Sequence, residues 1–209
     1  MKEIVLASRN AGKAREVEAL LDIPGLSIVL LSDLLPDDFV IEETGGSFEE
    51  NAWIKATLVC QATHRLALAD DSGLEVDALA GRPGVHSARF AGASATDEDN
   101  NRLLLASLTG VPRAERSARF RAVLALAAWR SGEVVRVAQT EGALDGFVID
   151  SPRGQGGFGY DCLFEPLARP GLTTAEISLA EKNALSHRGQ AVRALKPALE
   201  AWFERSAAV

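Results

Sequence analysis

The chain has 209 residues, 47% of them hydrophobic and 24% charged, which is ordinary for a globular protein with room for a substantial core. Its 29 acidic and 22 basic residues give a net charge of −7, which argues against a nucleic-acid partner, because phosphate backbones are bound by clustered Lys and Arg. The two cysteines, Cys60 and Cys162, provide neither a disulfide framework nor the spacing of a zinc site, so we expect a reducing, cytoplasmic location.

The N-terminal part of the chain predicts strands and helices in alternation. The apolar run at residues 4–7 is too short for a signal-peptide core or a membrane span, so we expect no membrane partner. Its unbroken apolar character indicates a buried strand. Residues 13–21 have the apolar spacing of a helix, residues 26–31 predict a second strand, and residues 32–46 predict a polar loop.

Two capping signals predict the next helices. Ser47 and Glu50 have the spacing of a capping box, which predicts a helix that begins near Phe48. The apolar run at residues 66–69 predicts a third buried strand, with two adjacent aspartates at its C-terminal end. Thr96 predicts the N-terminal cap of a further helix.

The middle of the chain predicts long strands. Residues 118–130 and 133–141 are expected to pair as a hairpin that turns at Ser131 and Gly132. A separate strand is expected at residues 142–149.

A glycine-rich loop at residues 151–161 precedes a helical C-terminal part, which we expect to run from a cap at Ser186 toward Arg205. Pro197 predicts a kink or a break in this helix. Strand–helix alternation at both ends, with long hairpin strands between them, predicts an α/β fold. We expect one domain over residues 1–209, with a mixed twisted sheet in two lobes, flanked by helices, and a central active-site cleft.

The segment SRNAGK lies between the first predicted strand and the first predicted helix. Small residues allow backbone N–H groups to point at an anion, the helix N-terminus adds its dipole, and Lys13 adds a positive charge. The segment lacks the spacing of a P-loop. The alternative interpretation, a plain strand-to-helix turn with an exposed lysine, stays open.

The adjacent carboxylates of Asp70 and Asp71 are the most unusual feature of the sequence, and Glu42 and Glu43 in the polar loop could join them. Carboxylates held together are costly unless a cation lies between them, and Mg²⁺ prefers oxygen ligands. One carboxylate can then bind metal while its neighbour deprotonates a water molecule. A capped turn, with one aspartate bonded to backbone amides and the other solvated, is the alternative.

Two further polar clusters follow in the second half of the chain. In GGFGYD, glycines around Phe158 and Tyr160 would let the backbone approach a flat ligand and a ring stack on a base, although both rings could equally fill the core. His187 and Arg188 are expected in the first turn of the last helix, where positive charge opposes the helix dipole. An anionic or carbonyl-bearing ligand would explain them and Lys182, and solvated surface charge is the alternative.

Five ordered segments together resemble a known family. They are IVLASRNAGKAREVEALL, EETGGSFEENAWIKA, ALADDSGLEVDALAGRPGVHSARFAG, GGFGYDCLFEP and EKNALSHRGQAVRAL. In this order they resemble the inosine/xanthosine triphosphate pyrophosphatases, which remove non-standard purine nucleotides, from Met1 to about Leu195. The resemblance implies a mixed α/β fold with two lobes, a homodimer, Mg²⁺ dependence, and hydrolysis of dITP, ITP and XTP to the monophosphate and pyrophosphate.

The resemblance also implies roles for individual residues. Asp71 would accept the proton of the attacking water and bind the metal, with Glu43 or Glu42 also near the metal. Ser72 would contact the substrate, and the remaining contacts fall in three groups. The triphosphate would be held by Ser8, Arg9, Asn10, Ala11, Gly12 and Lys13, the base by Phe158, Gly159, Tyr160 and Asp161, and the phosphates and the 6-oxo edge of the base by Lys182, His187 and Arg188.

Three rival functions remain at this point. The first is a pyrophosphatase for modified pyrimidine or methylated nucleotides. The second is a nucleotide-binding regulatory module without turnover, against which the carboxylate pair and the lysines argue. The third is a phosphotransferase, which the missing P-loop and kinase motifs disfavour.

Overall fold

The computed structural model describes residues 2–207, and the chain divides into two compact units. Unit 1 comprises three segments, Met1–Asp71, Ala122–Glu141 and Arg188–Val209. Unit 2 comprises Ser72–Arg121 and Gly142–His187. Each unit has its own hydrophobic core.

The strands form one six-stranded sheet in the order β2-β1-β3-β4-β5-β6. At one edge, β1 (Lys2–Leu6) pairs in parallel with β2 (Leu26–Leu30) and with β3 (Ala67–Val76), so that Val5 lies opposite Ala67. The other edge is antiparallel and consists of β5 and β6, whose bounds are Glu133–Val148 and Phe164–Pro166. The predicted mixed α/β sheet is thereby confirmed.

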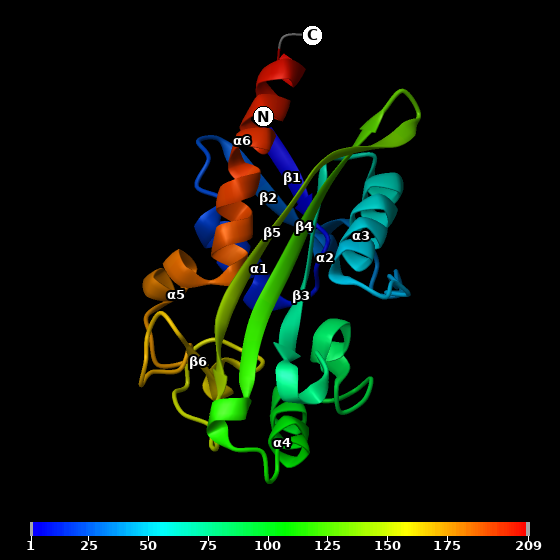
Figure 1. Ribbon diagram of the computed structural model, residues 1–209. Coiled ribbons are helices and arrows are strands. Elements are labelled where there is room, and N and C mark those ends of the chain that lie inside the picture. The colour runs from blue at the N-terminus through cyan, green and yellow to red at the C-terminus, as the bar shows by residue number, and fades with distance from the viewer. Residues whose placement is uncertain (1, 208–209) are drawn as a thin grey trace. The chain divides into compact units, whose positions relative to one another are not determined.

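In unit 1, helices cover both faces of the sheet (Figure 1). α1 (Ala11–Leu20) and α6 (His187–Ala207) lie on one face, and α3 (Phe48–Thr63) lies on the other. The unbroken apolar runs of the strands follow from this arrangement, because a strand buried on both faces needs apolar side chains on both. The core beneath α1 and α6 includes Ile4, Leu6, Val17, Leu68, Leu124, Val192 and Leu195.

Unit 2 contains α4 (Asp97–Ser107) and α5 (Leu179–Leu185). Its core joins apolar residues from the strands, from α4 and from the segments that follow them. The fully buried members are Leu74, Val76, Leu104, Leu108, Val148, Leu163 and Phe164.

Local signals placed the helix starts well. The Ser47 side chain accepts a hydrogen bond from Glu50 N at the start of α3, and Thr96 forms a capping box with Asp99 at the start of α4. The predicted hairpin is also confirmed, with β4 (Ser117–Arg130) followed by β5. Both residues of its turn have positive φ, as a type I′ hairpin turn requires.

Several boundaries differ from the predictions. β3 does not end at the aspartates but runs through both of them to Val76. Residues 142–149 do not form a separate strand, because β5 is continuous through residue 148. α6 is not broken at Pro197, which lies inside the helix. The four-residue helix α2 (Leu31–Leu34) begins at the last residue of the predicted second strand and continues into the predicted polar loop. α5 and β6 had no counterpart in the predictions.

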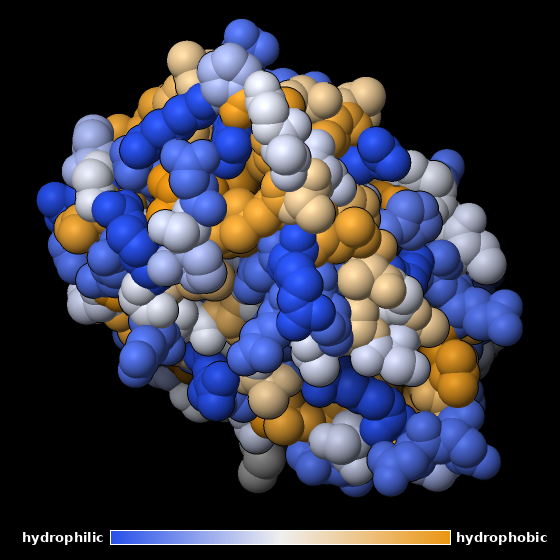
Figure 2. Space-filling view, turned by 90° about the horizontal axis from the view of Figure 1, so that it is seen from below, coloured by the Kyte–Doolittle hydropathy of each residue, from blue (hydrophilic) through white to orange (hydrophobic). Residues whose placement is uncertain are grey.

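The surface carries hydrophilic and hydrophobic residues side by side, as Figure 2 shows for the face seen from below. Large hydrophobic side chains that are exposed include Val40, Leu58, Leu103, Leu167, Leu172 and Leu179. Among the helices of residues 2–207, none combines the length and the apolar character that crossing a membrane requires.

Candidate active site

The two adjacent aspartates lie inside β3, and their side chains point to opposite faces of the sheet. Consecutive side chains of a strand point to opposite sides, so Asp70 and Asp71 diverge although they are neighbours in sequence. Asp70 meets Lys13 of α1 and Arg188 of α6, whereas Asp71 meets Lys55 of α3. The sequence suggested that the two carboxylates share one turn, but they do not. Separate cations relieve their mutual repulsion.

Asp70 is fully buried between two cations. Lys13 Nζ lies 2.8 Å from its Oδ1, and Arg188 Nε donates to its Oδ2 at 2.8 Å. Arg188 is itself buried and also donates to Glu16 of α1. Burial on its own would raise the pKa of Asp70, but Arg188 and Lys13 hold that pKa well below its usual value. Burial also lowers the pKa of Lys13, and Asp70 only partly opposes this effect.

On the other face, Lys55 joins two carboxylates. Its Nζ lies 2.5 Å from Asp71 Oδ1 and 2.8 Å from Glu43 Oε1. Burial on its own would lower the pKa of Lys55, but the two carboxylates raise it above its ordinary value. Burial raises the pKa of Asp71, against the opposing effect of Lys55 and Lys13. The structure thus brings Glu43 to Asp71, while Glu42 is exposed.

The second carboxylate oxygen of Asp71 is the clearest sign of a ligand. Asp71 Oδ2 is buried, yet no residue in the range 2–207 forms a hydrogen bond with it. A buried carboxylate oxygen without a partner costs free energy, so native proteins usually give such an atom a water, an ion or a substrate group. Asp71 therefore keeps one oxygen fixed by Lys55 and the other available.

The charges around Asp70 and Asp71 suit an added cation. Three cationic side chains (Lys13, Lys55 and Arg188) face four carboxylates (Glu16, Glu43, Asp70 and Asp71). Within residues 2–207, no group of three or more His, Cys, Asp or Glu side chains is placed to hold a metal ion alone. Mg²⁺ does not need one, because it commonly binds through one or two carboxylates and keeps several waters. Asp71 and Glu43 fit that requirement.

The predicted phosphate loop forms the start of α1. Asn10 is the N-terminal cap, and its side chain accepts a hydrogen bond from Lys13 N at 3.0 Å. Gly12 is buried and Ala11 is exposed, while Ser8 Oγ accepts a hydrogen bond from Asn10 N. Arg9 points to the loop after α2, where it donates to Pro36 O and pairs with Asp37.

In unit 2, the carboxylate of Asp161 organises the predicted base-binding loop. Its Oδ2 accepts a hydrogen bond from Phe158 N at 2.8 Å and lies 2.5 Å from Lys182 Nζ. The Thr174 hydroxyl lies 2.9 Å from Oδ1. The Lys182 ammonium is 5.0 Å from the centre of the Phe158 ring, within cation–π range. The loop approaches Asp161 so closely that a Cβ at Gly157 would lie 2.0 Å from Oδ2.

Side chains of α4 form hydrogen bonds with both backbone polar groups of Gly159, the next glycine of this loop. Gly159 N donates to Asp97 Oδ2 at 2.6 Å, and Asn101 Nδ2 donates to Gly159 O at 3.0 Å. Tyr160 is buried and its hydroxyl donates to Ser87 O. Burial raises the pKa of Tyr160, so this hydroxyl stays protonated and keeps its role as a donor.

The remaining predicted site residues are less informative. Ser72 follows Asp71 in β3 and is half-buried. His187 is buried, and its ring stacks on Phe120 with the ring centres 4.9 Å apart. Positive charge at the start of α6 was expected to need a special reason. For Arg188 the reason is that the carboxylates of Glu16 and Asp70 neutralise its charge.

Sequence reasoning missed Lys55, Glu16, Asn101 and Thr174. For Lys55 a signal existed. The buried face of α3 repeats with helical spacing, and polar residues stand on it at Asn51 and Lys55. A lysine on the buried face of a helix requires a charged partner, which here is the pair of carboxylates.

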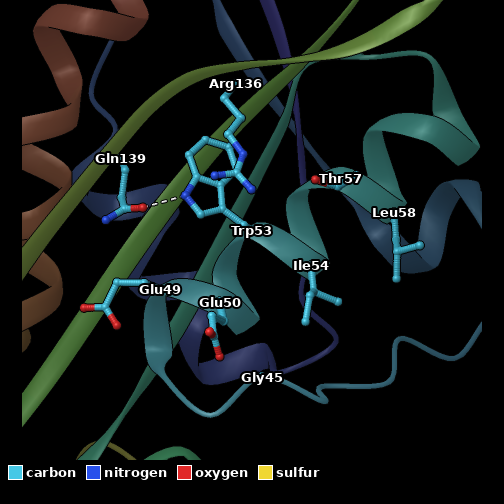
Figure 3. Close-up of a pocket in the computed structure, with 9 residues that line it drawn as sticks. All are labelled: Gly45, Glu49, Glu50, Trp53, Ile54, Thr57, Leu58, Arg136 and Gln139. Carbon is cyan, nitrogen blue, oxygen red and sulfur yellow. Dashed lines mark hydrogen bonds between the residues drawn. The ribbon is translucent and has the colours of Figure 1, made fainter.

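A surface pocket of about 750 Å³ lies in unit 1 and is lined mainly by side chains of α3 and β5 (Figure 3). Trp53 of α3 forms one wall, and its Nε1 donates to Gln139 Oε1 of β5. The Arg136 guanidinium lies 4.5 Å from the centre of the Trp53 ring. None of the side chains that line this pocket is among the predicted site residues.

Comparison with known proteins identifies the family of the chain. Residues 4–198 match the Ham1 family. A dITP/XTP pyrophosphatase of Geobacter sulfurreducens is 50% identical over 94% of this chain and 96% of its own, and one of Methylococcus capsulatus is 48% identical over 96% and 97%. The solved structure of a HAM1 protein from Coxiella burnetii has a TM-score of 0.81 and 41% identity, and the match covers 96% of this chain and all of that one. The chain belongs to the Ham1 family.

Proposed function

We propose that this protein hydrolyses non-standard purine nucleoside triphosphates, dITP, ITP and XTP, to the monophosphate and pyrophosphate. Relatives named dITP/XTP pyrophosphatase, which match nearly the whole chain, support this activity. The observation that carries the proposal is the buried Asp71, which has one oxygen without a partner among residues 2–207 and lies among lysines. A carboxylate in this setting is suited to water activation beside a polyanion.

Asp71 is the proposed proton acceptor. Lys55 holds Oδ1, which leaves Oδ2 to accept a hydrogen bond from the attacking water. Burial raises the pKa of Asp71 and so makes it a stronger base than an exposed aspartate. The attack on the α-phosphorus would release pyrophosphate.

The triphosphate is assigned to the start of α1 and to the lysines of unit 1. Residues 8–13 end at a helix N-terminus, whose free N–H groups and dipole favour phosphate. Lys13 and Lys55 add positive charge where negative charge develops. Ser72, Lys182, His187 and Arg188 stay predicted substrate contacts, although Arg188 is held by Asp70 and Glu16.

A divalent metal is consistent with this class of enzyme, and we propose Mg²⁺. Asp71 and Glu43 would hold it, since one has an available buried oxygen and both belong to the group with excess negative charge. When bound, it would neutralise charge on the phosphate oxygens. Glu43 is preferred over Glu42 because only Glu43 reaches Lys55.

The base is assigned to residues 158–161. Asp161 fixes the backbone of this loop and the Lys182 ammonium beneath the Phe158 ring, so the loop is preorganised for a flat ligand. A site that donates a hydrogen bond at purine position 6 accepts hypoxanthine and xanthine. It rejects adenine, whose amino group would leave that donor unpaired.

The homodimer and the cytoplasmic location stay predictions. The homodimer is expected from the family resemblance, and light scattering coupled to size-exclusion chromatography would measure it. The cytoplasmic location is expected from the cysteines, both of which are free thiols.

A steady-state assay with ITP, XTP, dITP, GTP and ATP tests the proposal, with Mg²⁺ and with chelator, scoring pyrophosphate and orthophosphate separately. Metal-dependent pyrophosphate release from ITP, XTP and dITP, with little from ATP or GTP, is the expected result. Orthophosphate as the product would mean that a different bond is cleaved. Binding without any product would identify a nucleotide-binding module instead.

A further inference from the structure

Asn51 is a buried amide on the face of α3 that also carries Lys55. Its side chain has no exposure to solvent, and its Oδ1 accepts a hydrogen bond from Gly45 N at 2.8 Å. Gly45 belongs to the loop that also contains Glu43. A Cβ at Gly45 would lie 2.7 Å from Asn51 Oδ1, so the loop and the amide are in close contact.

This hydrogen bond fixes which way the amide points. The backbone N–H of Gly45 can only donate, so the oxygen of Asn51 must face it and the NH₂ group must face away. Asn51 Nδ2 is buried, and no residue between 2 and 207 accepts a hydrogen bond from it. A buried NH₂ group without an acceptor is costly, which indicates that an acceptor outside the protein completes it.

The position of Asn51 indicates what that acceptor is. Asn51 and Lys55 are four residues apart on α3 and therefore neighbours on one helix face. Lys55 Nζ bonds Asp71, whose Oδ2 also has no partner among the described residues. An amide NH₂ group can only donate, and the ligand expected beside Lys55 is rich in anionic acceptors. We propose that Asn51 Nδ2 donates a hydrogen bond to an anionic oxygen of the substrate's polyphosphate, which makes Asn51 a further substrate-binding residue; this inference rests on the proposed function.

The test is the affinity for a nonhydrolysable ITP analogue with a methylene group between the α- and β-phosphates, measured by calorimetry with Mg²⁺. Asn51→Asp keeps the oxygen for Gly45 N but loses the NH₂ group, whereas Asn51→Ala loses both. We expect both variants to raise the dissociation constant about tenfold to a hundredfold, as for a hydrogen bond to a charged group. Both variants should also lower the melting temperature, Asn51→Ala because it leaves Gly45 N without its acceptor and Asn51→Asp because it adds a buried carboxylate.

Glu50→Ala is the matched control. Glu50 Oε2 accepts a hydrogen bond from Gly46 N, so its loss loosens the same loop without removing an amide donor. We expect this exposed position to change the dissociation constant by no more than about twofold. Near-normal affinity in either Asn51 variant, or equal weakening in Glu50→Ala, would overturn the inference. Failure of the wild-type protein to bind the analogue or to hydrolyse ITP would instead overturn the proposed function.

Discussion

At the residue scale, the structure explains how two neighbouring carboxylates can be buried together. Strand geometry sends Asp70 and Asp71 to opposite faces, and each meets its own cation. The two carboxylates then differ in whether an oxygen atom remains available to a ligand. Both oxygens of Asp70 are engaged by Lys13 and Arg188, whereas Asp71 keeps Oδ2 available. Asp70 is therefore suited to hold cations in place, and Asp71 is suited to react.

Asp71→Asn should lower kcat for ITP by about a thousandfold, the loss expected when a general base is removed. The amide keeps the shape of the side chain and an oxygen for Lys55, so the melting temperature should change little. The measurement is steady-state pyrophosphate release together with thermal unfolding. Asp145→Asn, at an exposed carboxylate on β5, is the control and should leave kcat unchanged. Turnover by Asp71→Asn close to wild type would exclude Asp71 as the base.

Lys55→Met should destabilise the fold, because it removes the cation that contacts both Asp71 and Glu43. Breaking a buried ion pair from one side costs about 3 kcal/mol, which urea denaturation can measure. Adding Asp71→Asn to Lys55→Met should recover part of this loss, since it removes the uncompensated charge. A double variant as unstable as the sum of the two single variants would show that the pair is not coupled.

Much of the candidate site was predictable from residue types, but its geometry was not. Lys13 and the aspartate pair were singled out from their chemistry, and the roles of Asp71 and of Glu43 or Glu42 came from the family resemblance. The structure pairs Lys13 with Asp70, and Lys55 with Asp71 and Glu43. Lys55 was missed because a lysine on a helix is usually solvated, and only the helical spacing of buried residues reveals it. Asp70 and Asp71 point to opposite faces because β3 extends through both of them. The local sequence did not predict that β3 extends so far.

At the element scale, predictions that rest on local chemistry succeeded, and those that rest on distant partners failed. Caps such as Ser47 and Thr96 act within one turn of their helix, so the sequence beside them is sufficient. β3 continues through two aspartates because distant lysines and an arginine neutralise them. β6 spans only three residues and is defined by its pairing with β5. No local sequence pattern predicts this pairing.

The position of the loop that we assign to the base depends on the hydroxyl group of Thr174. Thr174 lies 2.9 Å from Asp161 Oδ1, and Asp161 in turn holds Phe158 N and Lys182. Thr174→Val keeps the shape but removes this hydrogen bond, so we expect KM for ITP to rise about tenfold, with a smaller effect on kcat. Thr174→Ser should restore KM.

Thr173→Val is the matched control for this variant. Thr173 is equally buried, but its hydroxyl donates to Arg153 O and not to Asp161. The same chemical change there should lower stability and leave KM close to that of the wild type. Equal KM values for the two valine variants would show that Thr174 has a general structural role and does not position the loop.

At the scale of the whole molecule, charge links ligand binding to stability. The protein carries a net charge of −7, and in unit 1 four buried or half-buried carboxylates face three cations. Folding must therefore hold an excess of negative charge in a poorly solvated place. A cation that binds only the folded state relieves this cost, so the stability should depend on the metal concentration.

We predict that Mg²⁺ alone raises the melting temperature of the wild-type protein. At about a hundred times its dissociation constant the rise should be about 5–10 °C, from the linkage of binding to folding in a chain of this length. Potassium chloride at matched ionic strength is the control for general screening. Asp71→Asn combined with Glu43→Gln removes two carboxylate charges and should abolish most of the Mg²⁺-dependent rise, even if it makes the metal-free protein more stable. An equal rise in this variant and in the wild type would mean that Mg²⁺ binds elsewhere, because the stabilisation would then not involve Asp71 Oδ2, which has no partner in the described part of the chain.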